Sequence, residues 1–155
     1  MAMGTVFLTT VFVLFPAAAI QVNEAYDWPR WQIPGGAVVG PGLIVAGFAV
    51  ILFCSGLFSR LGRGTPVPIE PPENLVIKGL YRYSRNPMYV AQVAILLGLF
   101  IYRGELSLMV HVAIYSGVVQ AWVVSREEPE LRRRFGEEYV RYAQRVPRWI
   151  PRRPQ

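Results

Sequence analysis

The chain has 155 residues, a length that fits one domain; 53% of them are hydrophobic and only 17% are charged. A soluble protein of this size lacks the interior volume to bury so much apolar surface, and the composition also excludes intrinsic disorder. The single cysteine, Cys54, excludes a disulfide-rich scaffold. The net charge of +6 fits basic residues beside membrane helices, and we expect no nucleic-acid partner.

Four stretches without any Asp, Glu, Lys or Arg make up over half of the chain, at 1–23, 31–59, 86–102 and 106–125. A transmembrane helix needs about 20 mostly apolar residues. We therefore predict an all-α integral membrane protein with about four transmembrane helices, at 4–20, 37–58, 87–102 and 106–124. No basic residue precedes the first stretch, so we keep it as a helix rather than a cleaved signal peptide.

Local signals mark the ends of some of these helices. Asn86-Pro87 is typical of a helix start, and the tight turn at 103–105 makes the third and fourth helices an antiparallel hairpin. Gly36 and Gly40 stand at a spacing that permits close helix approach. Because glycine is common in membrane helices, we favour the interpretation that these two have no packing role.

All Lys and Arg residues except Arg30 and Arg103 lie either between residues 59 and 85 or after Val124. An even number of predicted spans separates the two segments, so both lie on one side, which the positive-inside rule makes the cytoplasm. We expect both termini there, in a bacterial inner membrane, with the endoplasmic reticulum as the alternative. The lipid bilayer is the expected partner, and the oligomeric state stays open.

Two segments outside the spans have distinct patterns. Residues 60–85 are rich in proline and glycine and predict an ordered loop. Residues 129–145 predict an amphipathic helix on the membrane surface or against that loop, and prolines end it. Its apolar face holds Leu131, Phe135, Tyr139, Tyr142 and Val146, and its polar face holds the expected pair of Glu130 with Arg134.

Polar residues that could carry chemistry gather at the ends of the predicted hairpin. Residues 81–89 hold two arginines, three tyrosines and a helix N-terminus, which suits an anion but also suits a capped, interfacially anchored helix. At the other end, Glu127 and Glu128 could coordinate a cation or accept hydrogen bonds from hydroxyls. Ser125 with Glu128 also fits a capping box, so a structural role stays open.

The remaining candidate groups are single residues. His111 is the only histidine, and with Cys54 as the only cysteine it cannot build a zinc site, so we expect no metal. His111 lies inside a predicted span without an acidic partner at that depth. We therefore expect a neutral histidine that is hydrogen-bonded to a neighbouring helix.

The segment Gly79-Leu80-Tyr81-Arg82-Tyr83-Ser84-Arg85-Asn86-Pro87-Met88-Tyr89 is followed 38 residues later by Glu127-Glu128, and then by Val146-Pro147-Arg148-Trp149-Ile150-Pro151. In order, spacing and placement around a hairpin, these motifs resemble the isoprenylcysteine carboxyl methyltransferases and the related phospholipid methyltransferases. The resemblance covers a methyltransferase-like core at 75–151. It implies S-adenosylmethionine as the methyl donor, bound at the cytoplasmic end of the hairpin.

The resemblance also implies which residues bind this cofactor: Gly79, Arg85, Asn86, Pro87, Met88, Tyr89, Glu127 and Glu128. Two departures concern the acceptor. The eukaryotic prenyl-protein enzymes have a histidine where this chain has Asn86, and their substrate-contacting arginine falls near Val123, which leaves Arg126 as the nearest candidate for substrate binding.

We therefore expect an integral membrane methyltransferase acting on a lipophilic, amphipathic acceptor, with a carboxylate of isoprenylcysteine type favoured. The alternatives are a phospholipid or a small amine or thiol, and a non-catalytic membrane protein that retains the fold. A carboxylate acceptor needs no general base. For an amine or thiol, Tyr89, Glu127 and Glu128 are the nearest candidates, and the catalytic base stays unassigned.

Overall fold

The computed structural model describes residues 9–62 and 74–152. Within these residues the chain is all-α, as predicted, and its one isolated β-bridge joins Arg30 and Glu105. The start of the predicted helix at 4–20 and residues 63–73 of the predicted loop lie outside the described residues.

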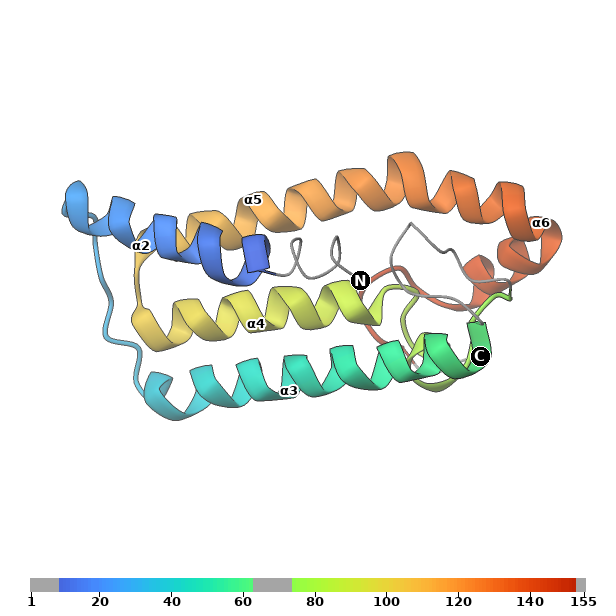
Figure 1. The fold of residues 1–155 in the computed structure, drawn as a ribbon, viewed down its shortest axis with the longest axis horizontal. Coiled ribbons are helices and arrows are strands. Elements are labelled where there is room, and N and C mark those ends of the chain that lie inside the picture. Colours follow the sequence, from blue (N-terminus) through green and yellow to red (C-terminus); the bar gives the residue numbers. More distant parts are fainter. Residues whose placement is uncertain (1–8, 63–73, 153–155) are drawn as a thin grey trace. The chain divides into compact units, whose positions relative to one another are not determined.

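The helices follow in chain order (Figure 1) as η1 (Thr10–Leu14), α2 (Phe15–Ala25), α3 (Gly36–Leu57), η2 (Phe58–Gly62), η3 (Gly79–Arg82), α4 (Pro87–Arg103), α5 (Leu106–Trp122), η4 (Val123–Glu127) and α6 (Glu128–Arg145). Four of them start within one residue of a predicted start: α3, α4, α5 and α6. The first predicted helix runs on to Ala25, five residues further than expected.

Among the described residues, two helical segments are long and apolar enough to cross a membrane, Gly36–Arg60 and Leu106–Arg145. Thr10–Ala25 and Pro87–Arg103 are apolar but shorter. The first long segment is not a buried core helix, because Val38 and Leu52 are 78% and 73% exposed. Large apolar side chains exposed along a charge-free helix are favourable against lipid and unfavourable against water. Exposed apolar side chains thus support Gly36–Arg60 as a span, Leu106–Arg145 is a second candidate by length and composition, and the four-span topology stays a prediction.

The chain divides into two compact units. The first comprises Met1–Phe48 and Gln92–Gly117, and the second comprises Ala49–Ala91 and Val118–Gln155. The expectation of a single domain stays a prediction.

In the first unit, glycines bring α3 and α4 into close contact. A Cβ atom on Gly36 would lie 2.5 Å from the carbonyl oxygen of Ile101, and one on Gly40 would lie 2.7 Å from that of Gly98. Distances this short leave no room for a side chain. The favoured interpretation of Gly36 and Gly40 as glycines without a packing role is therefore wrong.

The first unit also holds a buried acid beside the turn between α4 and α5. Glu105 is 1% exposed, and one of its oxygens lies 2.8 Å from Arg103 Nη2 and 3.3 Å from Arg30 Nη2. The Trp31 amide donates to the Gly104 carbonyl over 2.8 Å, which ties the loop after α2 to this turn. Burial of the carboxylate is tolerated because two guanidinium groups compensate its charge.

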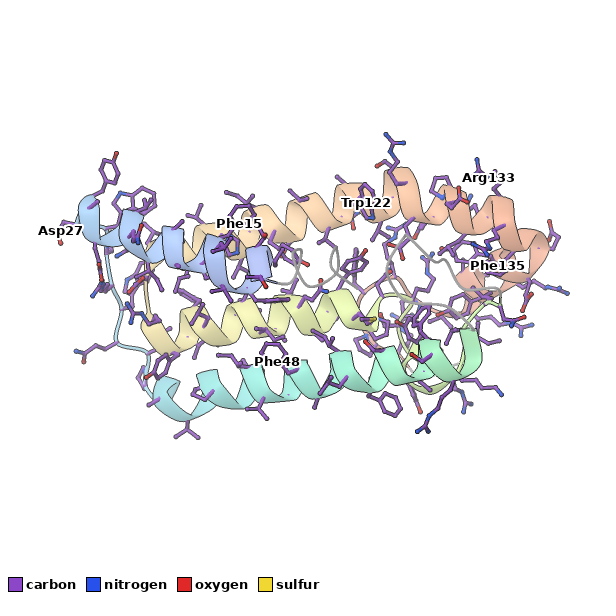
Figure 2. The ribbon with its side chains drawn as sticks, viewed as in Figure 1. Phe15, Asp27, Phe48, Trp122, Arg133 and Phe135 are labelled. Atoms are coloured by element: carbon purple, nitrogen blue, oxygen red, sulfur yellow. The ribbon has the colours of Figure 1, made fainter. Side chains whose placement is uncertain are left out.

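His111, in α5 of the first unit, is hydrogen-bonded to the backbone of Val11 in η1 and meets the Phe15 ring edge-on. This agrees with the expected histidine bonded to a neighbouring helix. Figure 2 shows the Phe15 side chain on α2.

In the second unit, α5 continues through the π-helical turn η4 into α6 without a break (Figure 1). The predicted capping box is therefore wrong. Ser125 does not cap a helix start, because its Oγ donates to the Ala121 carbonyl one turn back, over 2.6 Å. Glu127, the residue before α6, has α-helical backbone angles. A local signature cannot distinguish a helix start from a helix that continues through the same residues.

The helix α6 bends at Gly136, whose φ of 51° and ψ of −130° are not helical. Glycine adopts such angles without a steric penalty. Beyond the bend, Tyr139 and Val146 are buried, in agreement with the predicted apolar face. Glu130 is paired with Arg133, which Figure 2 labels on this helix, and its expected pair with Arg134 stays a prediction.

Candidate functional site

All the predicted site residues lie in the second unit. The η3 turn carries Gly79, the start of α4 carries residues 86–89, and the end of η4 with the first residue of α6 carries both glutamates. The sequence starts α4 at Pro87, which has no amide hydrogen and fits the first position of a helix.

Gly79 has a structural role at the edge of the site. Its φ is +61°, and a Cβ atom there would lie 2.6 Å from Cδ1 of Leu57 and 3.2 Å from Cε1 of Phe53. The glycine therefore lets the η3 backbone pack directly against α3. Met88 is also structural, since it packs against a buried cluster of Cys54, Val76 and Tyr81.

The centre of the site is a buried carboxylate held by two arginines. Glu128 is 7% exposed. Arg85 Nη1 donates to its Oε1 over 2.8 Å, and Arg148 donates to Oε1 from Nε and to Oε2 from Nη2, over 2.7 and 3.0 Å. Arg85 Nη1 also donates to the Tyr139 hydroxyl over 3.3 Å. Both oxygens of Glu128 are thus occupied by cations of the chain itself.

These ion pairs determine the protonation state of Glu128. Burial alone would raise the pKa of its carboxyl, but the hydrogen bond from Arg148 and the charges of Arg85 and Arg148 outweigh that effect and lower the pKa. Glu128 is therefore a fixed anion that neutralises arginines, and it is a poor proton acceptor.

The C-terminal segment is fixed on the start of α4 by backbone contacts. Ser84 Oγ and Asn86 Nδ2 each donate to the Arg148 carbonyl over 3.1 Å, and the Arg85 amide donates to the Pro147 carbonyl over 2.9 Å. The Arg152 amide continues the contact by donating to the Tyr83 carbonyl over 3.0 Å. The side-chain nitrogen of Asn86 is therefore engaged in holding this segment.

Glu127 differs from its neighbour. The Tyr89 hydroxyl donates to Glu127 Oε2 over 3.1 Å, and Glu127 has no ion pair within residues 9–62 and 74–152. Glu127 follows the charge-free part of α5 and is half-buried. Burial raises the pKa of its carboxyl, the Tyr89 hydrogen bond opposes this, and the charge of Glu128 adds to it, for a net rise. Of the two glutamates, Glu127 is thus the one without an ion pair in the described part of the chain.

The structure brings together Arg85, Asn86, Tyr89, Glu127 and Glu128 from the predicted set. Arg126 is exposed, with no hydrogen bond or ion pair in the described part of the chain, and nothing in the structure supports a substrate contact by it. Sequence reasoning missed the roles of Ser84, Tyr139 and Arg148. Ser84 and Arg148 were noted only as parts of motifs, and Tyr139 only as part of the apolar face of the predicted helix at 129–145.

The long apolar helices and the compact polar centre around Glu127 and Glu128 define a helical, membrane-associated protein with a site of enzyme-like chemistry. Residues 37–138 match the phospholipid methyltransferase family, and the chain belongs to it. The resemblance found from the motifs is thereby confirmed. The match includes Tyr89, Glu127 and Glu128 and ends before Arg148.

The chain is also similar to an uncharacterized protein of Haemophilus influenzae, with 36% identity over 63 residues. The similar region is 41% of this chain and 100% of that protein. Family membership makes the protein one of a family of methyltransferases and supports its association with a membrane.

Proposed function

We propose that this protein transfers a methyl group from S-adenosylmethionine to an amine on an amphipathic acceptor. The single observation that carries the proposal is the state of Glu127. Its carboxylate accepts a hydrogen bond from Tyr89 and has no cationic partner in the described residues. We also propose that the site faces the cytoplasm, on the side where the basic residues gather.

The polar groups of Arg85 and Glu127 fit the charged groups of this cofactor. The Nε atom of Arg85 is buried and has no hydrogen-bond partner in the described residues, so it suits a ligand carboxylate. Glu127 suits a ligand ammonium or hydroxyl group. Arg85 and Glu127 would hold the cofactor, with the α4 N-terminus beside them. Bound there, it would supply an electrophilic methyl group on a sulfonium.

The charges at the site favour an amine acceptor. Arg85 and Arg148 are both paired with Glu128, and with Glu127 ionised the four side chains carry no net charge, so the site has little positive charge to offer an acceptor carboxylate. An ammonium group would be attracted to Glu127, whose raised pKa suits it to accept the ammonium proton on a carboxylate oxygen. Tyr89 would orient that carboxylate through its hydroxyl.

A carboxylate acceptor of isoprenylcysteine type is the second candidate. The unpartnered Arg85 Nε favours it, because this donor could serve an acceptor carboxylate instead of the cofactor. Such an acceptor is already ionised and needs no base. Loss of the Glu127 carboxylate would then have little effect on the methyl-transfer step.

Calorimetry of S-adenosylmethionine with the detergent-purified full chain tests the proposal. We expect micromolar-range binding by the wild type, weaker binding by Glu127→Gln, and unchanged binding by Glu137→Gln, an exposed acid on α6 that serves as the matched control. Absence of binding by folded wild-type protein would overturn the proposal.

The acceptor class needs a second measurement. Extracted membrane lipids are incubated with cofactor labelled on its methyl group, and the products are treated with mild base. A methylated amine keeps its label, whereas a methyl ester releases it. Release of the label by base would identify a methyl ester. That result would overturn the amine acceptor in favour of the carboxylate candidate.

A further inference from the structure

A second feature of the same unit lies outside the residues assigned to methyl transfer. Leu75, Ile77, Arg82 of the η3 turn and the last turns of α6 line an open cavity of about 450 Å³. The Tyr142 hydroxyl, on the cavity wall, donates to the Tyr81 carbonyl over 2.7 Å and so fixes α6 against η3. The cavity is thus built by a defined contact between two elements.

The polar side of the cavity is cationic. Arg82, Arg141 and Arg145 line it, against one acid, Glu138, for a net charge of +2. None of the three arginines has an ion pair within residues 9–62 and 74–152. Arg141 and Arg145 are four residues apart on one helix, a spacing at which like charges repel. A bound anion would relieve that repulsion.

The other side of the cavity is apolar. Val146 is buried, Leu75 is half-buried, and Ile77 exposes 41% of its surface beside the arginines. A free phosphate would gain nothing from such a wall. A molecule with an anionic headgroup and an acyl chain matches both sides at once, and cavities of roughly 300–1,000 Å³ hold ligands of headgroup size.

We propose that this cavity binds the headgroup of an anionic phospholipid, with the phosphate at Arg82, Arg141 and Arg145 and the start of the acyl chains against Leu75 and Ile77. The lipid is a bound ligand and not the methyl acceptor. The proposal concerns binding alone, so it does not depend on the cofactor or on the acceptor class.

The test uses the full chain in detergent and native mass spectrometry with three separate probes: phosphatidylglycerol, phosphatidylcholine and inorganic phosphate. We expect phosphatidylglycerol to bind about tenfold more tightly than phosphatidylcholine, because arginines near the lipid phosphates favour net negative headgroups. Inorganic phosphate should neither bind nor compete. Equal affinity for the two lipids, or competition by phosphate alone, would overturn the proposal.

Two triple variants separate the cavity from general charge. Arg82→Gln/Arg141→Gln/Arg145→Gln should lose about a hundredfold in affinity for phosphatidylglycerol. Arg132→Gln/Arg133→Gln/Arg134→Gln removes the same number of charges from α6 outside the cavity and should retain the wild-type preference. Equal losses in both variants would mean that only the net charge attracts the lipid, against the proposal.

Two further measurements keep the test decisive. Arg141 is exposed, so Arg141→Gln alone should fold and should show a partial loss of phosphatidylglycerol binding. Binding of S-adenosylmethionine should be unchanged in the cavity variants. A parallel loss of cofactor binding would mean that the cavity belongs to the methyl-transfer site, and the lipid proposal would fail while the proposed function stood.

Discussion

Arg148 binds Glu128 through two nitrogen atoms, Nε at 2.7 Å and Nη2 at 3.0 Å, although 20 residues separate them in the chain. The same arginine accepts hydrogen bonds from Ser84 and Asn86 through its backbone carbonyl. One residue of the C-terminal segment thus joins the start of α4 to the start of α6. Arg148 therefore positions the site by fixing two of its elements, without contact to Glu127.

Replacement of Arg148 should destabilise the protein. Arg148→Gln removes both hydrogen bonds to the buried Glu128, while Arg85 still compensates part of its charge, so we expect a loss of about 1–3 kcal/mol. Thermal unfolding in detergent measures this. Arg148→Lys should recover only part of the stability, since an ammonium cannot form the two-nitrogen contact. An exposed control, Arg132→Gln, should unfold like the wild type.

Removal of the Tyr89 hydroxyl should lower activity while leaving the fold intact. Tyr89→Phe deletes the hydrogen bond that orients Glu127, and we expect kcat/KM to fall by about tenfold, the value of one hydrogen bond to a charged group. Radiolabelled methyl transfer measures this. Tyr83→Phe serves as the control, because Tyr83 is exposed and its hydroxyl makes no hydrogen bond in the described residues. Equal effects in both variants would contradict the role of Tyr89.

The raised pKa of Glu127 predicts a pH dependence of its own. A raised pKa means that the carboxyl holds its proton to a higher pH than a free glutamate, whose pKa is about 4.3. Activity should therefore rise with pH as Glu127 ionises, with a midpoint above that value. Glu127→Gln should lose this limb of the profile along with most activity. An acidic limb that persists unchanged in Glu127→Gln would assign it to another group.

Contact between α3 and α4 should be sensitive to one methyl group. A Cβ atom on Gly98 would lie 2.6 Å from the Gly40 carbonyl oxygen, so Gly98→Ala should destabilise the protein by about 1–3 kcal/mol through overpacking. Gly117→Ala is the control in α5, where nothing lies within 4 Å of the added atom. Thermal unfolding in detergent compares the two. A wild-type melting temperature for Gly98→Ala would contradict the close contact.

The sequence predicted the helices best where their ends carry strong local signals. Proline at position 87 and the Gly104 turn set the limits of α4 to within one residue. The sequence-based prediction of a helix start at Ser125 was wrong, because a capping box and an uninterrupted helix contain the same residues at the same spacing. Hydrophobic periodicity likewise could not show the bend at Gly136, since the apolar pattern continues across it.

The sequence indicated some members of the candidate site but not how they pair. The motifs indicated that Arg85, Tyr89 and both glutamates belong together, and the structure places them so. No local pattern could show that the two adjacent glutamates have opposite roles, because their difference depends on Arg148 from the far end of the chain. Such long-range contacts leave no periodic trace in the sequence.

The π-helical turn η4 ends at Glu127, directly before Glu128, and contains one residue more than an α-helical turn would. This is because its hydrogen bonds join residues five apart instead of four. Deletion of one residue from this turn would convert it to α geometry and keep Glu127 and Glu128 at the same azimuth about the helix axis. An insertion would rotate them by about 100°. We therefore expect this stretch to tolerate deletion of one residue better than insertion of one.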